Sequence, residues 1–238
     1  MVSAPWAAPT FMASALLWIT ATVVAYAGAL WLYARVRGNP FFVPVATTSL
    51  VVMALLWVTR TPYRTYADAA MPLSFLVGPA TVALAVPLYA QMERLRRIWR
   101  PLLVALFVGC SVALLVAIGV AWALGGSWET LVSVAPKSAT MPIAMPMAGR
   151  LGGVPALAAV AVVITGVVGT IVSHPLLRLL RVRDPAARGF AIGLTAHAIG
   201  MARELQIHPT SGGFAALAMG LNGILTALLM PLALMLFR

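Results

Sequence analysis

The sequence predicts an all-α integral membrane protein, a multi-span helical bundle that forms a single polytopic membrane domain over residues 1–238. Hydrophobic residues make up 62% of the chain and charged residues only 9%, with a mean hydropathy of +1.00, whereas a soluble domain carries about 25% charged residues. In addition, five stretches of 18 to 25 residues contain no Asp, Glu, Lys or Arg, and about 20 apolar residues suffice to cross a bilayer. These predicted spans are residues 11–34, 41–58, 101–124, 154–177 and 213–237.

The first apolar stretch is expected to remain in the protein as a helix. Residues 1–10 contain no Lys or Arg and the stretch is 24 residues long, whereas a cleaved signal peptide has a basic start and a shorter apolar core. The single cysteine, Cys110, lies inside another apolar stretch, so the chain cannot form an internal disulfide. We interpret Cys110 as a packing residue.

The net charge of +11 comes mainly from arginines that lie beside the apolar stretches. Two clusters occupy residues 94–100 and 178–188. Short Arg-rich loops next to membrane spans lie mostly in the cytoplasm, so we expect both clusters on the cytoplasmic side of a bacterial inner membrane. Topology and contact with lipid headgroups therefore account for the basic charge, and we expect no nucleic-acid partner.

Residues 128–153 interrupt the apolar pattern with prolines, glycines and a lysine. If this segment crossed the membrane, one Arg cluster would be forced to the outside, whereas a segment that dips in and returns leaves both clusters in the cytoplasm. Proline breaks a helix, and broken backbone at membrane depth is tolerated only where it is buried in protein or lines a cavity. The sequence therefore predicts a re-entrant segment here.

An upstream segment has the same pattern. Residues 80–87 read ATVALAVP and residues 139–146 read ATMPIAMP, and four of the eight positions are identical. Together with their flanking spans, these two Pro-interrupted, re-entrant segments predict an inverted repeat with residues 41–100 and 101–159 as its units. Interrupted segments in corresponding positions of two repeats indicate the binding site of a transporter.

The expected tip of the second segment suits an anion. Lys137, Ser138 and Thr140 follow Pro136 and precede a predicted helix start. Free backbone N–H groups and the positive end of the helix dipole attract a carboxylate at such a position. Lys137 would add a full charge and Thr140 a hydroxyl, although Lys137 could instead extend to the lipid headgroups.

Three further candidates for substrate binding lie in the first segment and in the last span. Pro79 and Thr81 would offer freed backbone and a hydroxyl, and the alternative there is a helix kink sealed by its neighbours. Asn222 is a polar residue in an otherwise apolar span, and its alternative is a hydrogen bond to a neighbouring helix.

Residues 187–207 are moderately polar and contain glycines at spacings near four, which predicts a short helix packed closely within the bundle. His197 and Arg203 could bind the substrate or pair with Glu204. Because Arg203 and Glu204 are adjacent in sequence, they do not share a helix face. A histidine in a bundle can also serve the structure alone, so both possibilities stay open for His197.

The sequence contains no P-loop, dinucleotide fingerprint, HExxH or GxSxG motif. Its three histidines and five acidic residues are scattered without the spacing of metal ligands. We therefore expect neither catalysis, nor a metal, nor a cofactor.

Four stretches together resemble one known family. They are GPATVALAVPLY at residues 78–89, KSATMPIAM at 137–145, ARGFAIGLTAHAIGMARE at 187–204 and GGFAALAMGLNGILTALLMP at 212–231. This pattern resembles the LrgB/CidB family of bacterial membrane proteins, whose relatives include the plastid glycolate/glycerate translocator. The chain departs from the family pattern at Met141 and Met201, where the family usually has threonine, so a shifted substrate preference is expected.

The resemblance implies two alternative functions. Some members are associated with the movement of glycolate, glycerate or pyruvate, and the family was first described as holin- and antiholin-like regulators of murein hydrolases. It also implies a small LrgA/CidA-type membrane protein as a partner, and we expect a homodimer. We favour a transporter of small monocarboxylates, with a holin-like regulator and a purely structural subunit for an LrgA-type partner as the alternatives.

Overall fold

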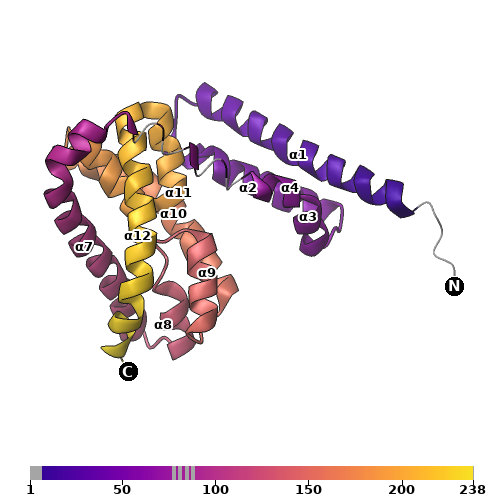
Figure 1. The fold of residues 1–238 in the computed structure, drawn as a ribbon. Helices are drawn as coiled ribbons and strands as arrows, with labels where there is room; N and C mark the ends of the chain where they lie inside the picture. The colour runs from indigo at the N-terminus through magenta and orange to yellow at the C-terminus, as the bar shows by residue number, and fades with distance from the viewer. Residues whose placement is uncertain (1–6, 77–78, 80–81, 84–85, 87–88, 238) are drawn as a thin grey trace. The chain divides into compact units, whose positions relative to one another are not determined.

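The computed structural model describes residues 7–76, 79, 82–83, 86 and 89–237, and it confirms the predicted fold class (Figure 1). These described residues form helices joined by short connections, and they include no β-strand. Contacts divide the chain into two compact units, Met1–Ala83 and Leu84–Arg238. The second unit contains most of the predicted site residues.

The first unit is built on one long helix. Its elements are α1 (Ala7–Arg35), the 3-10 helix η1 (Pro40–Phe42), α2 (Pro44–Val58), α3 (Tyr63–Ala69) and α4 (Met71–Phe75). Trp18 of α1 and Tyr66 of α3 meet edge to face with their ring centroids 5.7 Å apart. The Tyr66 hydroxyl also lies 3.2 Å from Thr22 Oγ1. These contacts hold α3 against α1, and a helix of seven residues needs such tertiary contacts to be stable.

The second unit contains three long helices and two interrupted segments. Its elements are α7 (Met92–Ala123), α8 (Trp128–Val134), α9 (Met141–Arg150), α10 (Pro155–Leu179), α11 (Pro185–Ile207) and α12 (Pro209–Met235). Proline begins α10, α11 and α12, where its missing N–H is not needed and its fixed φ suits a helix. Inside α7, Pro101 interrupts the helix and Ile98 is non-helical, so a kink separates the basic first turns from the apolar remainder.

Four of the five predicted spans are confirmed as helices long and apolar enough to cross a membrane. Within the described residues they are Ala15–Arg35, Met92–Ala123, Pro155–Leu179 and Pro209–Met235. The predicted span at 41–58 is wrong in length, because Pro44 starts a new helix and leaves residues 40–42 in a separate 3-10 turn. The 15 residues of α2 extend about 22 Å, against about 30 Å of hydrocarbon.

Helices α8 and α9 form a hairpin in the segment that the sequence predicts to be re-entrant. They contain seven and ten residues, so each is too short to cross a membrane. Ser133 Oγ, near the end of α8, accepts a hydrogen bond of 2.8 Å from the N–H of Val154, directly before α10, and so ties the two ends of this segment together. The return of this hairpin within a membrane stays a prediction. So does the inverted repeat, because Thr81 and several other residues of 80–87 lie outside the described residues.

Helix α11 is interrupted at His197, where φ is 41° and ψ is −134°. Residues other than glycine rarely adopt such a positive φ. Before this turn, the backbone of Gly189 lies against Ser211 and that of Gly193 against Ala215, so closely that an added Cβ would come within 2.1 Å of a carbonyl oxygen. Because residue numbers rise together in both segments, the first half of α11 (185–196) runs parallel to α12.

The second half of α11 (198–207) returns to the end where the first half begins. Glu204 near its end contacts the ring of His174 in α10, and Arg188 near the start of α11 contacts the same ring. Both ends of α11 therefore lie together, and α11 is a second hairpin with its turn at His197. The close packing predicted for residues 187–207 is confirmed, but a single short helix is wrong, because the chain reverses at His197, a residue that carries no proline or glycine signal.

The two Arg clusters lie at the same end of the second unit. Arg94 of α7 pairs with Asp184, which immediately precedes α11. Asp184 Oδ1 also accepts a hydrogen bond of 2.9 Å from the Ala187 N–H. This bond, with the nearby Arg94 guanidinium, holds the pKa of Asp184 below its usual value. The shared end agrees with the expected topology, and its cytoplasmic location stays a prediction.

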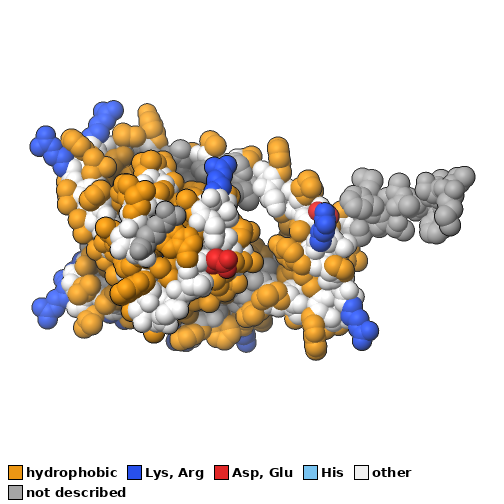
Figure 2. Space-filling model, turned by 90° about the horizontal axis from the view of Figure 1, so that it is seen from below, with side chains coloured by type: hydrophobic (Ala, Val, Ile, Leu, Met, Phe, Trp, Pro, Cys, Tyr) orange, Lys and Arg blue, Asp and Glu red, His pale blue; other side chains and the backbone are white. Residues whose placement is uncertain are grey.

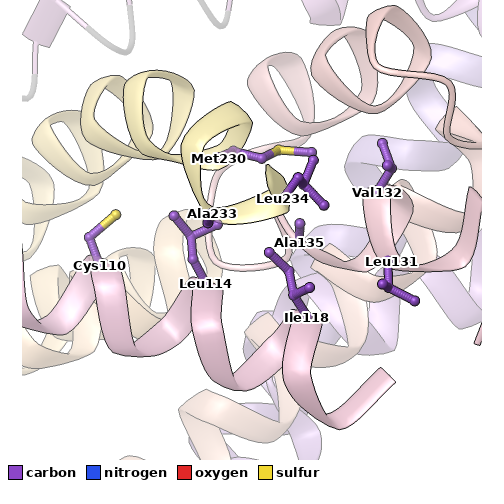
Figure 3. Packing of buried hydrophobic residues seen from close by; sticks show 9 residues of the cluster. All are labelled: Cys110, Leu114, Ile118, Leu131, Val132, Ala135, Met230, Ala233 and Leu234. Carbon is purple, nitrogen blue, oxygen red and sulfur yellow. The ribbon is translucent and has the colours of Figure 1, made fainter. Parts of the chain in front are cut away.

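Nine buried side chains fix α8 between α7 and α12 (Figure 3). The cluster consists of Cys110, Leu114 and Ile118 from α7, Leu131, Val132 and Ala135 from α8, and Met230, Ala233 and Leu234 from α12. The burial of Cys110 agrees with its interpretation as a packing residue. Elsewhere large hydrophobic side chains such as Val120 and Leu228 are exposed, and hydrophobic side chains cover most of the surface in Figure 2, as expected of a surface that faces lipid.

We predict that both Arg clusters are cytoplasmic. In a background with Cys110→Ser, a membrane-impermeant thiol reagent added to intact cells should label Leu124→Cys but neither Arg96→Cys nor Arg183→Cys, since Leu124 ends α7 at the opposite end. Labelling after cell permeabilisation controls for accessibility. If only one of the two Arg positions were labelled from outside, the shared end would be wrong.

We predict that Gly193→Ala lowers the free energy of unfolding in detergent by about 1–3 kcal/mol, because the new Cβ would lie 2.1 Å from the carbonyl oxygen of Ala215. Gly220→Ala is the matched control, since nothing lies within 4 Å of its added Cβ. That variant should be neutral or slightly stabilising. Equal stability of the two variants would contradict the close approach of α11 to α12.

Candidate functional site

The tips of the two hairpins meet at the middle of α12. Asn222 Nδ2 donates one hydrogen bond of 3.0 Å to the carbonyl oxygen of Ser138, at the tip of the α8–α9 hairpin. The same nitrogen donates a second bond of 3.2 Å to the carbonyl oxygen of Leu194, near the turn of α11. Asn222 therefore serves as a clasp between two segments that approach from opposite ends of the unit.

The orientation of the Asn222 amide is fixed by these two acceptors. Nδ2 carries two N–H groups, and the reverse orientation would place Oδ1 against two carbonyl oxygens. Asn222 is only 1% exposed, and among the described residues Oδ1 has no hydrogen-bond partner. The clasp therefore acts through its donors alone.

A groove of about 610 Å³ lies beside the clasp, between α7, α10 and the two hairpin tips. This volume is within the range of about 300–1,000 Å³ that is usual for small-molecule sites. Lys137 and Ser138 line it from the α8–α9 hairpin, Thr165 from α10 and Thr195 from α11, and the rest of the lining is largely apolar. The groove thus combines one cation and three hydroxyls with an apolar wall.

Among the described residues, Lys137 is the one cationic side chain that lines this groove. Its Nζ lies 3.4 Å from Ser138 Oγ, and none of the ion pairs between described residues includes it. A charged residue at the centre of a bilayer costs about 2.5–3.5 kcal/mol on insertion scales. An anion bound in the groove would offset this energy, so the arrangement favours an anionic ligand.

The other residues predicted near the hairpin tips are placed as follows. Thr140 caps the start of α9 with extended backbone, and its carbonyl accepts hydrogen bonds from Ile143 and Ala144 N–H groups at 2.9 Å. Pro79 is exposed, and Thr81 lies outside the described residues. A substrate contact by these residues stays a prediction.

His197 and Arg203 bind backbone carbonyls of α10. The ring of His197 is 2% exposed, and its Nε2 donates a hydrogen bond of 2.9 Å to the carbonyl oxygen of Val162. Arg203 Nη1 donates one of 2.9 Å to the carbonyl oxygen of Thr170. These contacts hold the hairpin of α11 on α10, and they add a structural role to the predicted substrate role, which is untested.

Sequence reasoning missed a buried polar cluster at the base of α11. Glu204 contacts His174 and Ser211, and Arg188 contacts the other side of the His174 ring. Glu204, an acidic residue in an apolar region, was the signal in the sequence that could have indicated this cluster. Its partners could not be predicted, because they meet Glu204 only through the reversal of the chain at His197. Among the described residues, no group of three or more His, Cys, Asp or Glu side chains could hold a metal ion.

These helices and this groove define a helical membrane protein. The model of the LrgB-like family matches residues 22–236, and the chain therefore belongs to that family. This match confirms the resemblance of the four sequence stretches and extends it to most of the chain.

Several relatives cover most of the chain. An uncharacterised protein of Haemophilus influenzae is 36% identical over 77% of this chain and 80% of its own length. The uncharacterised protein YxaC of Bacillus subtilis is 34% identical over 94% of this chain and 97% of its own length. The antiholin-like protein LrgB of Bacillus cereus is 29% identical over 90% and 93%, respectively. No solved structure matches the chain.

We predict that Asn222→Ala lowers the free energy of unfolding in detergent by about 1–3 kcal/mol, because two hydrogen bonds to hairpin carbonyls are lost. Amide hydrogen exchange should quicken at the tips of both hairpins. Asn39→Ala is the control, because it removes a hydrogen bond from the Phe41 N–H to Asn39 Oδ1 in the first unit and should leave amide exchange at both hairpin tips unchanged. Faster exchange in only one hairpin would contradict the clasp.

Proposed function

We propose that this chain is a multi-pass transporter of small monocarboxylates, of the glycolate, glycerate or pyruvate type, in the bacterial inner membrane. One observation carries this proposal: a lysine without an acidic partner among the described residues lines a groove where two hairpin tips meet. The carboxylate would bind Lys137, and the hydroxyls of Ser138, Thr165 and Thr195, which line the same groove, would bind the polar remainder of the substrate.

The α9 helix supports this assignment. It has ten residues and begins at Met141, immediately after Lys137, Ser138 and Thr140. The positive end of its dipole and its first N–H groups therefore lie at the hairpin tip, where they favour a negative charge. A bound carboxylate would gain from both the ammonium group and the helix start.

The opposed hairpins supply a means of alternating access. The α8–α9 hairpin approaches the groove from one end of the unit and α11 from the other, and each contributes lining residues. A shift of either hairpin would open the groove toward its own end only. Transporters commonly place the substrate between such discontinuous helices and move one part against the other.

The names of relatives favour a second function. The Bacillus cereus relatives are called antiholin-like protein LrgB, and this supports an antiholin-like role more directly than it supports transport. Such a role, exerted on murein hydrolases and together with an LrgA-type membrane partner, does not require an anion site. The two proposals therefore differ in their dependence on Lys137.

We predict that Lys137→Ala abolishes or strongly weakens counterflow of labelled glycolate or pyruvate in proteoliposomes, while the protein still inserts and folds. Among the described residues that line the groove, the cation is then lost. Lys137→Arg should be impaired less than Lys137→Ala, because it keeps the positive charge. It should still be impaired, because the planar guanidinium group differs in shape from the ammonium group. Arg150→Ala, an exposed change at the base of the same hairpin, is the control and should transport normally.

Three outcomes separate the functions. Loss in Lys137→Ala with normal Arg150→Ala supports transport through the groove. Normal counterflow by a well-folded Lys137→Ala would show that the lysine does not bind the substrate. Absence of counterflow in the unmodified protein, together with altered lysis or murein hydrolase activity in a deletion strain, would favour the antiholin-like role.

A further inference from the structure

The base of the α11 hairpin contains a buried carboxylate that the groove does not use. Glu204 is 2% exposed, and its Oε1 lies 2.6 Å from His174 Nε2. Ser211 Oγ donates a hydrogen bond to Glu204 Oε2. Arg188 Nη2 lies 2.9 Å from His174 Nδ1. The cluster thus joins α10, both halves of α11 and the start of α12.

The donors and acceptors of the cluster follow from its chemistry. A guanidinium group only donates, so His174 Nδ1 accepts from Arg188. The ring is then neutral and carries its proton on Nε2, which donates to an ionised Glu204. The negative charge is therefore hydrogen-bonded by neutral donors, and the Arg188 guanidinium behind the histidine attracts it through space.

We propose that Glu204, with His174, binds a proton that is transported together with the carboxylate substrate, an inference that rests on the transport function proposed above. In this site the proton is added to Glu204 Oε2, and the carboxylate becomes a neutral acid. No other bond forms or breaks. The site is separate from the groove, which the turn of the same hairpin lines through Leu194 and Thr195.

Ser211 makes this protonation reversible without movement of the backbone. A hydroxyl can donate or accept, so the Ser211 hydroxyl can rotate and accept the new O–H of Glu204 while His174 continues to donate to Oε1. Protonation of His174 at Nδ1 would instead displace Arg188 from the ring. Glu204 is therefore the better acceptor. The side chain of His174 is 15% exposed and offers a path from the basic end.

The position of the cluster couples it to the substrate. Neutralising Glu204 weakens its bonds to α10 and α12, and these bonds fix the second half of α11, whose other end is the turn beside the groove. Of the other charged groups on these elements, Arg178 is exposed in the last turn of α10. Arg203 binds the Thr170 carbonyl, and His208 caps α12. One hairpin thus responds to a proton at its base and to an anion at its tip.

Transport in proteoliposomes tests this proposal through Glu204→Gln, which mimics the neutral acid. Two measurements are compared: counterflow of labelled glycolate or pyruvate at equal pH, and net accumulation driven by an inside-alkaline pH gradient. Glu204→Gln should retain counterflow but lose gradient-driven accumulation. Glu93→Gln is the matched control, because Glu93 is an exposed carboxylate of α7 that pairs with Arg97 at the surface.

The outcomes are distinguishable from failure of the proposed function. If the unmodified protein shows no counterflow, transport itself is wrong. If it shows counterflow but accumulates substrate with a sodium gradient and not with a pH gradient, the proton site is wrong. Accumulation by Glu204→Gln equal to that of Glu93→Gln would also overturn it.

A second variant keeps the proposal testable if Glu204→Gln fails to fold. Ser211→Ala removes the group that accepts the proton of the neutral acid, and it should shift the pH at which accumulation is half-maximal while sparing counterflow at equal pH. An unchanged pH profile in Ser211→Ala would contradict the site. Infrared difference spectra on acidification should contain a protonated carboxyl band that is absent from Glu204→Gln, and its persistence there would also contradict the site.

Discussion

The side-chain amide of Asn222 holds together the two halves of the candidate site. Buried carbonyl groups at the hairpin tips lack regular helical partners, so each needs a donor from elsewhere in the protein. Asn222 supplies both donors from one nitrogen, to Ser138 and to Leu194. The groove lies beside these bonds because Lys137 precedes one acceptor and Thr195 follows the other.

A half-buried cation and a buried anion lie at different levels of the second unit. The cation of Lys137 lies at the hairpin tips, whereas the anion of Glu204 lies at the base of α11. In an environment of low dielectric, an ionised group is held by close polar partners or changes its charge state. Glu204 has such partners in His174 and Ser211, whereas Lys137 contacts Ser138 and has no acidic partner among the described residues. Because of this difference, we propose that an external anion binds at Lys137 and a proton at Glu204.

Composition and charge determined the class of the protein. Four uncharged stretches became long apolar helices because helices of about 20 apolar residues bury their own backbone groups in lipid. The prolines of residues 128–153 predicted the hairpin of α8 and α9 with Lys137 at its tip, because Pro136 follows the end of α8 and Pro142 lies in the first turn of α9. The Arg clusters likewise indicated that the two loops share an end.

Only the tertiary structure determined that residues 187–207 form a hairpin and not one continuous helix. The sequence has helical character on both sides of His197, and no local signal marks a reversal there, so a continuous helix was the natural expectation. The positive φ of His197 persists because its ring is bonded to the Val162 carbonyl and α12 packs against the first half of α11. The contacts of Glu204 with His174 and Ser211 follow from that reversal. Local sequence determines where helices form and where they are interrupted. Contacts between side chains that are distant in sequence depend on how the helices pack, and no single segment encodes that packing.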